Sequence, residues 1–189
     1  MIYREDRPLP EAVSRLYPFP RRYVDLEPGL RMHWAEAGAG EPILFVHGNP
    51  TWSFLWRRFV SGVADAGFRG VAPDHVGFGL SDKPLDDAYY SPERHVQNLT
   101  RFVEALDLRD LTLVVHDWGG PIGLGWAVRH PERVKRLVIF NTLAFPPKQK
   151  RAMSPFHLVF GSPLGSLASR FNLLVEVAMR FGVAQRAKM

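Results

Sequence analysis

The stretch from Leu111 to Gly120, LTLVVHDWGG, combines the features of a reactive turn. Five apolar or β-branched residues lead into a polar corner, and two glycines follow directly before a helical pattern. A strand, one reactive residue and a helix in this order are typical of a nucleophile elbow, whose tip residue stands clear of the sheet in a strained backbone conformation. The pattern therefore predicts that Asp117, at the tip, is a nucleophile.

Asp117 also allows a simpler interpretation, because aspartate is a favoured helix N-cap. A helix is predicted to begin near Pro121, and its dipole would stabilise a carboxylate at that end. Val115 replaces the usual small first residue of an elbow, which weakens the pattern slightly. In an elbow, the backbone N–H of Trp118 would point to the place where negative charge builds up on a reacting oxygen. The ten residues alone leave both roles open.

The composition indicates a globular protein. With 189 residues, 46% of them hydrophobic, the chain is long enough to form one domain with a substantial core. It contains no apolar run of membrane-spanning length, and residues 1–10 lack the apolar centre of a signal peptide. The absence of cysteine excludes disulfides, thiol catalysis and cysteine-based metal sites. We expect a cytoplasmic location.

The excess positive charge lies at the C-terminal end. Residues 146–189 carry seven Lys or Arg and one Glu, whereas residues 1–145 carry 17 basic and 18 acidic residues. A basic and partly apolar stretch can bind nucleic acid or a membrane surface. Such stretches are more often the solvated face of a helix. We therefore expect neither a nucleic-acid nor a membrane partner.

Strands alternate with helices through the first three quarters of the chain. Strands are predicted at 21–27, 31–37, 42–46, 68–73, 111–115 and 134–140, and helices at 52–66, after Ser91-Pro92, and from the elbow to about 130. This alternation predicts an α/β fold with a mainly parallel sheet. Chemistry in such sheets gathers beyond the carboxyl ends of the strands. Four polar residues follow predicted strand ends: Asn49, Asp74, Asp117 and Asn141.

Three segments together resemble the haloalkane dehalogenases of the α/β-hydrolase superfamily: HGNPTWSFLWR (47–57), PDHVGFGLSDKP (73–84) and VVHDWGGPIG (114–123). They occur in the order of that family, and the likeness covers about residues 20–145. The resemblance implies an α/β-hydrolase fold, with residues 1–143 as the N-terminal part of the core and residues 144–189 as the beginning of a helical cap domain. It also favours the nucleophile over the capping role of Asp117.

The resemblance implies a two-step substitution that begins at Asp117. The carboxylate would attack the halogen-bearing carbon, displace halide and leave an alkyl ester on the protein. The side-chain N–H groups of Asn49 and Trp118 would bind the halide. Their backbone N–H groups would form the oxyanion hole for ester hydrolysis, which yields an alcohol. The implied partners are a small apolar halogenated substrate, water and halide, with no metal and no cofactor.

The family's last two strands, its third triad acid and its catalytic histidine lie beyond the cap region. We therefore expect a sheet truncated before its last strands, and a site that forms the ester but lacks the base that hydrolyses it. None of the seven histidines stands at the expected place, and His157 lies in the cap part. Asn141 occupies the position where some members of the family carry the catalytic acid, and an amide cannot serve as that acid.

Two other functions remain open. An epoxide hydrolase resembles the same elbow and also uses an aspartate nucleophile, with cap tyrosines as activating groups; Asn49 favours the dehalogenase. A hydrolase scaffold that binds apolar ligands without turnover also agrees with the missing base.

Structural roles are expected for several neighbours of these motifs. His116 is next to the nucleophile along a strand, so its side chain should point away from Asp117. His47 and Asp74 are expected to hydrogen-bond tight turns. Three aromatic residues are expected in the core: Trp52, Phe54 and Trp56.

Overall fold

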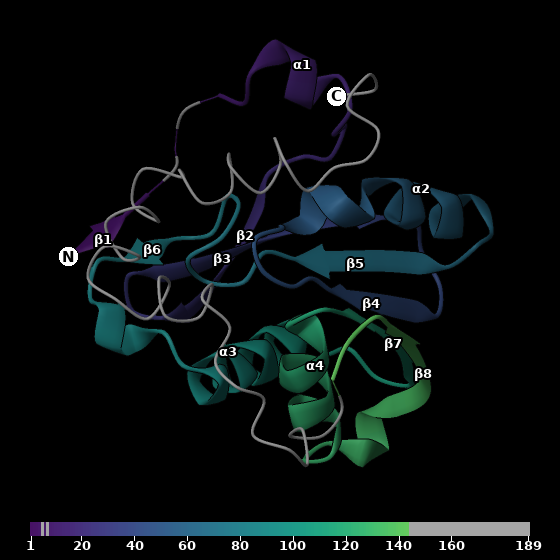
Figure 1. Cartoon of the computed structure of the whole chain (residues 1–189). Helices are drawn as coiled ribbons and strands as arrows, with labels where there is room; N and C mark the ends of the chain where they lie inside the picture. The colour runs from purple at the N-terminus through teal and green to yellow at the C-terminus, as the bar shows by residue number, and fades with distance from the viewer. Residues whose placement is uncertain (5, 7, 144–189) are drawn as a thin grey trace. The chain divides into compact units, whose positions relative to one another are not determined.

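A six-stranded sheet forms the centre of the computed structural model, which describes residues 1–143 apart from residues 5 and 7 (Figure 1). The strands lie in the order β2 (Arg22–Glu27), β3 (Leu30–Ala37), β5 (Arg69–Pro73), β4 (Pro42–Val46), β7 (Leu111–His116) and β8 (Val134–Phe140). The last four are parallel, whereas β2, β3 and β5 pair antiparallel. The predicted α/β fold with a mainly parallel sheet is confirmed.

Three helices cover the sheet, with α2 (Arg57–Asp65) on one face and α3 (Pro92–Ala105) and α4 (Gly119–Ala127) on the other (Figure 1). The Ser91 side chain caps α3 by accepting the Arg94 N–H, and Pro92 occupies the first turn, as the sequence predicted. The minor elements are β1 (Ile2–Tyr3), which pairs with β6 (Lys83–Pro84), α1 (Glu11–Ser14), and 3-10 turns at Ser53–Trp56, Asp87–Tyr89 and Pro131–Arg133.

Neighbouring residues of the central strands enter opposite cores. In β4, Leu44 and Val46 join the core beneath α3 and α4, whereas Phe45 joins the core beneath α2. This division follows from the two-residue period of a strand. It explains why the run PILFV is apolar throughout, since both faces of this strand are covered.

Helix α4 begins at Gly119, two residues before Pro121, near which the start was predicted. The first helical turn closes directly behind the elbow, where the Gly120 N–H donates to the Asp117 carbonyl at 2.9 Å. A side chain at Gly119 would clash with the carbonyl oxygens of Val46 and His47. The two glycines thus belong to the helix itself and allow it to start against β4. The helix predicted at 52–66 divides into a 3-10 turn followed by α2.

All the described residues belong to one unit of the chain, Met1–Phe145. The cap segment expected at 144–189, with His157, lies outside the described residues. Within residues 1–143, β8 pairs with β7 alone and forms one edge of the sheet. No helix in this described part is both long enough and apolar enough to cross a membrane.

Replacing Phe102 tests the core beneath α3. Its side chain is fully buried and packs edge-to-face on Trp34 at 5.8 Å between ring centroids. Phe102→Ala should lower the free energy of unfolding by about 3–5 kcal/mol, through lost burial and a residual cavity. Phe59→Ala is the matched control, because the Phe59 side chain is half exposed. Urea titration measures both, and equal losses would contradict this assignment of the core.

Candidate active site

Asp117 occupies the tip of a tight turn between β7 and α4. Its backbone φ angle of 51° lies in the left-handed region, which residues other than glycine rarely adopt. Trp118, rather than Asp117, holds the N-cap position of α4, and no side chain caps the helix there. The capping interpretation of Asp117 is therefore wrong. The backbone strain expected for an elbow is present.

The Asp117 carboxylate is held from the end of β4. Its Oδ1 atom accepts the backbone N–H of Asn49 at 2.9 Å, across 68 positions of sequence. The close approach requires a glycine at position 48, where a Cβ would lie 2.6 Å from the Asp117 Cβ and 2.7 Å from the Trp118 nitrogen. The peptide bond between Asn49 and Pro50 is cis. Two of the three predicted site residues, Asp117 and Asn49, are thus in direct contact.

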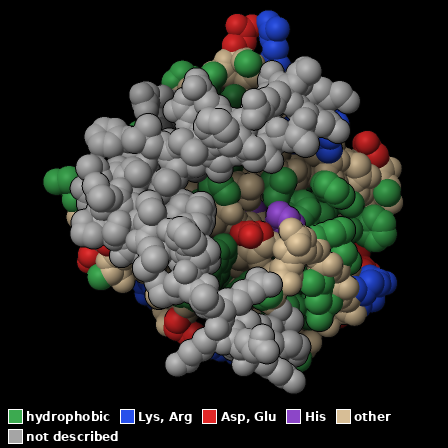
Figure 2. All heavy atoms as spheres, viewed as in Figure 1, with side chains coloured by type: hydrophobic (Ala, Val, Ile, Leu, Met, Phe, Trp, Pro, Cys, Tyr) green, Lys and Arg blue, Asp and Glu red, His purple; other side chains and the backbone are tan. Residues whose placement is uncertain are grey.

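The third predicted residue, Trp118, shares a pocket with Asn49. The pocket has a volume of about 280 Å³ and is lined by Gly48, Asn49, His75, Phe78, Tyr90, Ser91, Pro92, His95, Trp118 and Ile122. Acidic, histidine and hydrophobic side chains gather at the centre of the face viewed in Figure 2. Asp117 is not among the lining residues, but Gly48 and Trp118 on either side of its turn are. The Trp118 side chain is half exposed.

Three histidines stand in a row from the end of β4 to this pocket. The ring centroids of His47 and His75 are 4.4 Å apart, and those of His75 and His95 are 5.3 Å apart. Burial holds the pKa of His75 well below its usual range and lowers the pKa of His95 to about 4. Burial also lowers the pKa of His47. All three are therefore neutral at pH 7, and no side chain that lines the pocket is ionised.

Two of these histidines and Tyr90 were missed as pocket residues in the sequence. His75 follows the strand end at Asp74, so the carboxyl-end rule already indicated its place. His95 lies one helical turn after Ser91, the N-cap of α3, so both residues lie on the same side of the start of this helix. Tyr90 precedes that helix. The local signals existed, but nothing in them shows that the three side chains meet.

Asp74 holds the loops that surround the pocket. Its fully buried carboxylate accepts hydrogen bonds from His33 Nδ1 at 2.9 Å and from the backbone N–H groups of Ser53 at 2.7 Å and Leu80 at 2.8 Å. Burial alone would raise its pKa, but the hydrogen bonds hold the pKa of Asp74 below its usual value. His47 similarly accepts the His75 N–H at 2.9 Å. Both residues hydrogen-bond turns, as the sequence predicted.

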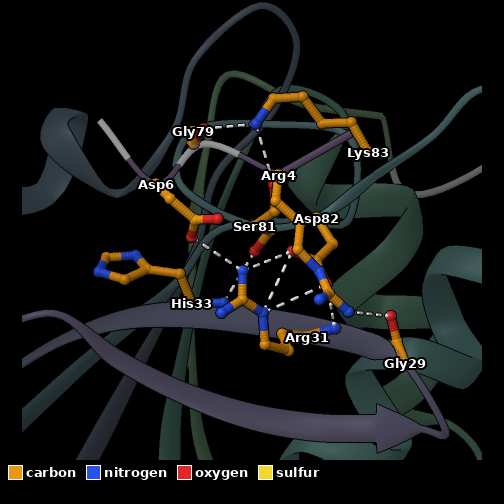
Figure 3. A network of polar contacts seen from close by, with 9 residues as sticks. All are labelled: Arg4, Asp6, Gly29, Arg31, His33, Gly79, Ser81, Asp82 and Lys83. Carbon is orange, nitrogen blue, oxygen red and sulfur yellow. Dashed lines mark hydrogen bonds and ion pairs between the residues drawn. The ribbon is translucent and has the colours of Figure 1, made fainter. Parts of the chain in front are cut away.

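A second polar network fixes the far end of the loop after β5 (Figure 3). The buried Asp82 carboxylate accepts the Arg31 backbone N–H at 2.8 Å and an Arg31 guanidinium N–H at 3.1 Å. The Ser81 hydroxyl accepts the His33 N–H at 2.9 Å and donates to the Asp74 carbonyl at 2.6 Å. The loop is thus anchored along β3 at both ends.

The remaining predicted neighbours have structural places. The ring of His116 lies edge-on to Trp56, with centroids 6.3 Å apart. Trp56 is buried in the core beneath α2, and two further aromatic residues, Trp52 and Phe54, pack against that core. Asn141 follows β8 with a φ of 34°. Within the described ranges, no histidine hydrogen-bonds Asp117, and no group of His, Asp or Glu side chains could hold a metal ion.

Comparison with known proteins agrees with this architecture. The model of a family described as "alpha/beta hydrolase fold" matches residues 41–160. The chain belongs to this family. The match contains the elbow, the Asn49 loop and the pocket residues.

Similar relatives carry two different names. A cis-3-alkyl-4-alkyloxetan-2-one decarboxylase of Shewanella oneidensis is 42% identical over 178 residues, which cover 92% of this chain and 55% of the relative. A haloalkane dehalogenase of Mycolicibacterium paratuberculosis is 44% identical over 147 residues, which cover 75% of this chain and 48% of the relative. The structure of the haloalkane dehalogenase DpaA from Paraglaciecola agarilytica NO2 is similar with a TM-score of 0.72 and 35% identity, covering 85% of this chain and 58% of that one. The resemblance to haloalkane dehalogenases is thus confirmed, and this chain spans about half the length of the curated relatives.

The row of neutral histidines predicts a stability that falls in mild acid. Below pH 6.5 the unfolded chain takes up protons at these histidines while the folded chain does not, so the free energy of unfolding decreases as pH falls. Each such histidine contributes a slope of at most about 1.4 kcal/mol per pH unit. His95→Gln should therefore flatten the profile between pH 6 and pH 4.5, measured by urea titration. His130→Gln removes a histidine outside the row as a control, and an unchanged slope in His95→Gln would contradict the prediction.

Proposed function

We propose that this chain carries the nucleophile and the leaving-group ligands of an enzyme that cleaves carbon–halogen bonds. The observation that carries the proposal is the orientation of the Asp117 carboxylate. Its Oδ1 atom is held by the Asn49 N–H in a left-handed turn, and its Oδ2 atom has no hydrogen-bond donor among the described residues. One oxygen is fixed while the other keeps its lone pairs for attack.

In the first step, Asp117 Oδ2 forms a bond to the carbon as the carbon–halogen bond breaks. The bonding pair leaves with the halide, and Asp117 becomes an alkyl ester whose carbonyl oxygen is Oδ1. In the second step, water adds to the carboxyl carbon, and negative charge develops on Oδ1 beside the Asn49 N–H. The intermediate then expels the alcohol and restores the carboxylate, with one proton released overall. An oxyanion donor of this kind typically contributes about 3–4 kcal/mol.

The leaving halide meets neutral donors in the proposed site. Asn49 and Trp118 both line the pocket, and an amide and an indole each offer an N–H group. None of the ten lining side chains is ionised at pH 7, since His75 and His95 are neutral. An uncharged, largely aromatic wall suits a neutral apolar substrate and a weakly hydrated anion, and it would not retain the halide as tightly as a fixed cation.

A second candidate is the decarboxylation of a 3,4-dialkyloxetan-2-one, favoured by the relative of that name, which aligns with 92% of this chain. Asp117 Oδ2 would attack ring carbon 4 and break its bond to the ring oxygen, which becomes a carboxylate on carbon 3. Loss of CO₂ then moves an electron pair into a carbon–carbon double bond and expels Asp117. The products are one alkene and one CO₂, and no water is consumed. The same nucleophile serves both reactions.

Alkylation of Asp117 is the decisive prediction. Incubation with a 1-bromoalkane should add one alkyl mass, found by peptide mass spectrometry on the fragment that contains Asp117, with release of one bromide. Asp117→Asn should abolish the adduct, because an amide is a far poorer nucleophile. Asp110→Asn is the matched control, since Asp110 is a surface aspartate with a similarly left-handed φ of 50°. An adduct that still forms in Asp117→Asn would contradict the assignment of Asp117 as the nucleophile.

The substrate class is decided by comparing three probes. A cis-3,4-dialkyloxetan-2-one that yields alkene, detected by gas chromatography, would favour decarboxylation over dehalogenation. An adduct formed from an epoxyalkane but not from a bromoalkane would favour an epoxide hydrolase. If the protein binds the probes but reacts with none of them, the remaining interpretation is a protein that binds apolar ligands without turnover.

Halide binding should depend on Trp118. Chloride or bromide should quench tryptophan fluorescence with a saturable dependence on concentration, and Trp118→Phe should remove most of that response. Trp34→Phe is the control, because the Trp34 indole N–H already donates to Glu36 at 2.7 Å. Saturable quenching that persists in Trp118→Phe would exclude Trp118 as a halide ligand.

A further inference from the structure

Thr142 contacts the elbow from the adjacent strand end. β8 ends at Phe140, and Asn141 turns the chain in a left-handed conformation with a φ of 34°. The hydroxyl of Thr142 then donates to the backbone carbonyl of Asp117. The resemblance to haloalkane dehalogenases places Asn141 where some members carry the catalytic acid, but the polar contact to the elbow comes from the next residue, Thr142.

The Thr142 side chain also fills the space that Gly120 leaves open. A Cβ at position 120 would lie 2.7 Å from both the Cβ and the Cγ2 atoms of Thr142. The hydroxyl and the methyl group of Thr142 therefore both lie against the first turn of α4, and the hydroxyl also reaches the elbow. This packing fixes the rotamer that makes the hydrogen bond, since a threonine side chain has few alternatives once one face is blocked.

The hydrogen bond orients a peptide plane that matters for the proposed reaction. The Asp117 carbonyl accepts both the Thr142 hydroxyl and the Gly120 N–H, the latter at 2.9 Å. In a planar trans peptide, the carbonyl of Asp117 and the N–H of Trp118 point in opposite directions. Two donors on the carbonyl therefore aim the Trp118 N–H away from α4, toward Gly48, whose Cβ position lies 2.7 Å from the Trp118 nitrogen.

We propose that Thr142 is a positioning residue that aims the Trp118 N–H at the oxyanion. The inference rests on the proposed function, because it presupposes an ester on Asp117. The attack of Oδ2 on carbon places no new charge on Oδ1, whereas hydrolysis does. Loss of the Thr142 hydroxyl should therefore slow ester hydrolysis and leave alkylation nearly unchanged.

The test compares the two steps in Thr142→Val and Thr142→Ser. After alkylation by a bromoalkane, loss of the adduct mass is followed in alkaline buffer, where hydroxide attacks the ester without a protein base. Thr142→Val, which keeps the shape but not the hydroxyl, should slow this loss by about 10- to 100-fold. Its alkylation rate should change less than about threefold, and Thr142→Ser should restore hydrolysis.

The matched control is Thr100→Val, which removes a hydroxyl that donates to the Val96 carbonyl at 3.0 Å within α3. Unchanged hydrolysis in Thr142→Val, or equal slowing of both steps, would overturn the proposal. If Thr142→Val does not fold, Thr142→Ala replaces it in the same comparison.

A second measurement needs no reaction. The NMR resonance of the Trp118 backbone amide should shift in Thr142→Val and return to its original position in Thr142→Ser. If the parent chain is never alkylated, the proposed function fails, and this resonance still decides the role of Thr142.

Discussion

The buried Asp74 carboxylate is the interaction on which the arrangement of the site depends. A buried charge is tolerated only when hydrogen bonds replace its lost hydration. Asp74 obtains them from β3, through His33, and from the backbone of the loops after β4 and β5. Those loops carry Asn49 and His75. The Asp74 carboxylate thus holds together two segments that line the pocket. Because the hydrogen bonds from both loops replace its lost hydration, the buried charge is stable only while both loops keep this position.

The left-handed turn at Asp117 is a second constraint on the site. The hydrogen bond between the Asn49 N–H and the Asp117 carboxylate joins this turn to the loop that Asp74 holds. Asp117 is held left-handed between β7 and α4, and the loop fixed by Asp74 presents the Asn49 N–H to it at 2.9 Å. The glycines at 48 and 119 make this meeting possible, because a side chain at either position would occupy the space of the opposing backbone. Strain at Asp117 is therefore maintained by its neighbours, which is how strained residues persist at functional sites.

Much of the fold could be predicted from local pattern, and much of the site could not. The apolar run at Pro42–Val46 and the Ser91-Pro92 start of α3 are encoded within a few residues. The exact start of α4 at Gly119 is set by close packing on β4, a contact between distant segments that the local pattern did not show. The contact of Thr142 with Asp117 left no local signal either. Periodicity reports which face of an element is buried, not which side chains meet across it.

The neutrality of the pocket bears on how one nucleophile could serve two leaving groups. A halide and a ring-opened carboxylate both depart as anions, and neutral N–H donors stabilise either without trapping it, whereas a fixed cation would bind the product more strongly. The two proposed reactions therefore share the alkylation of Asp117 and differ only in the step that follows it. An ester with a neighbouring carboxylate can lose CO₂ and release Asp117 unaided, whereas a simple alkyl ester needs water and a well-aimed oxyanion hole. Under these proposals, the peptide plane that Thr142 and Gly120 hold matters for hydrolysis and not for decarboxylation.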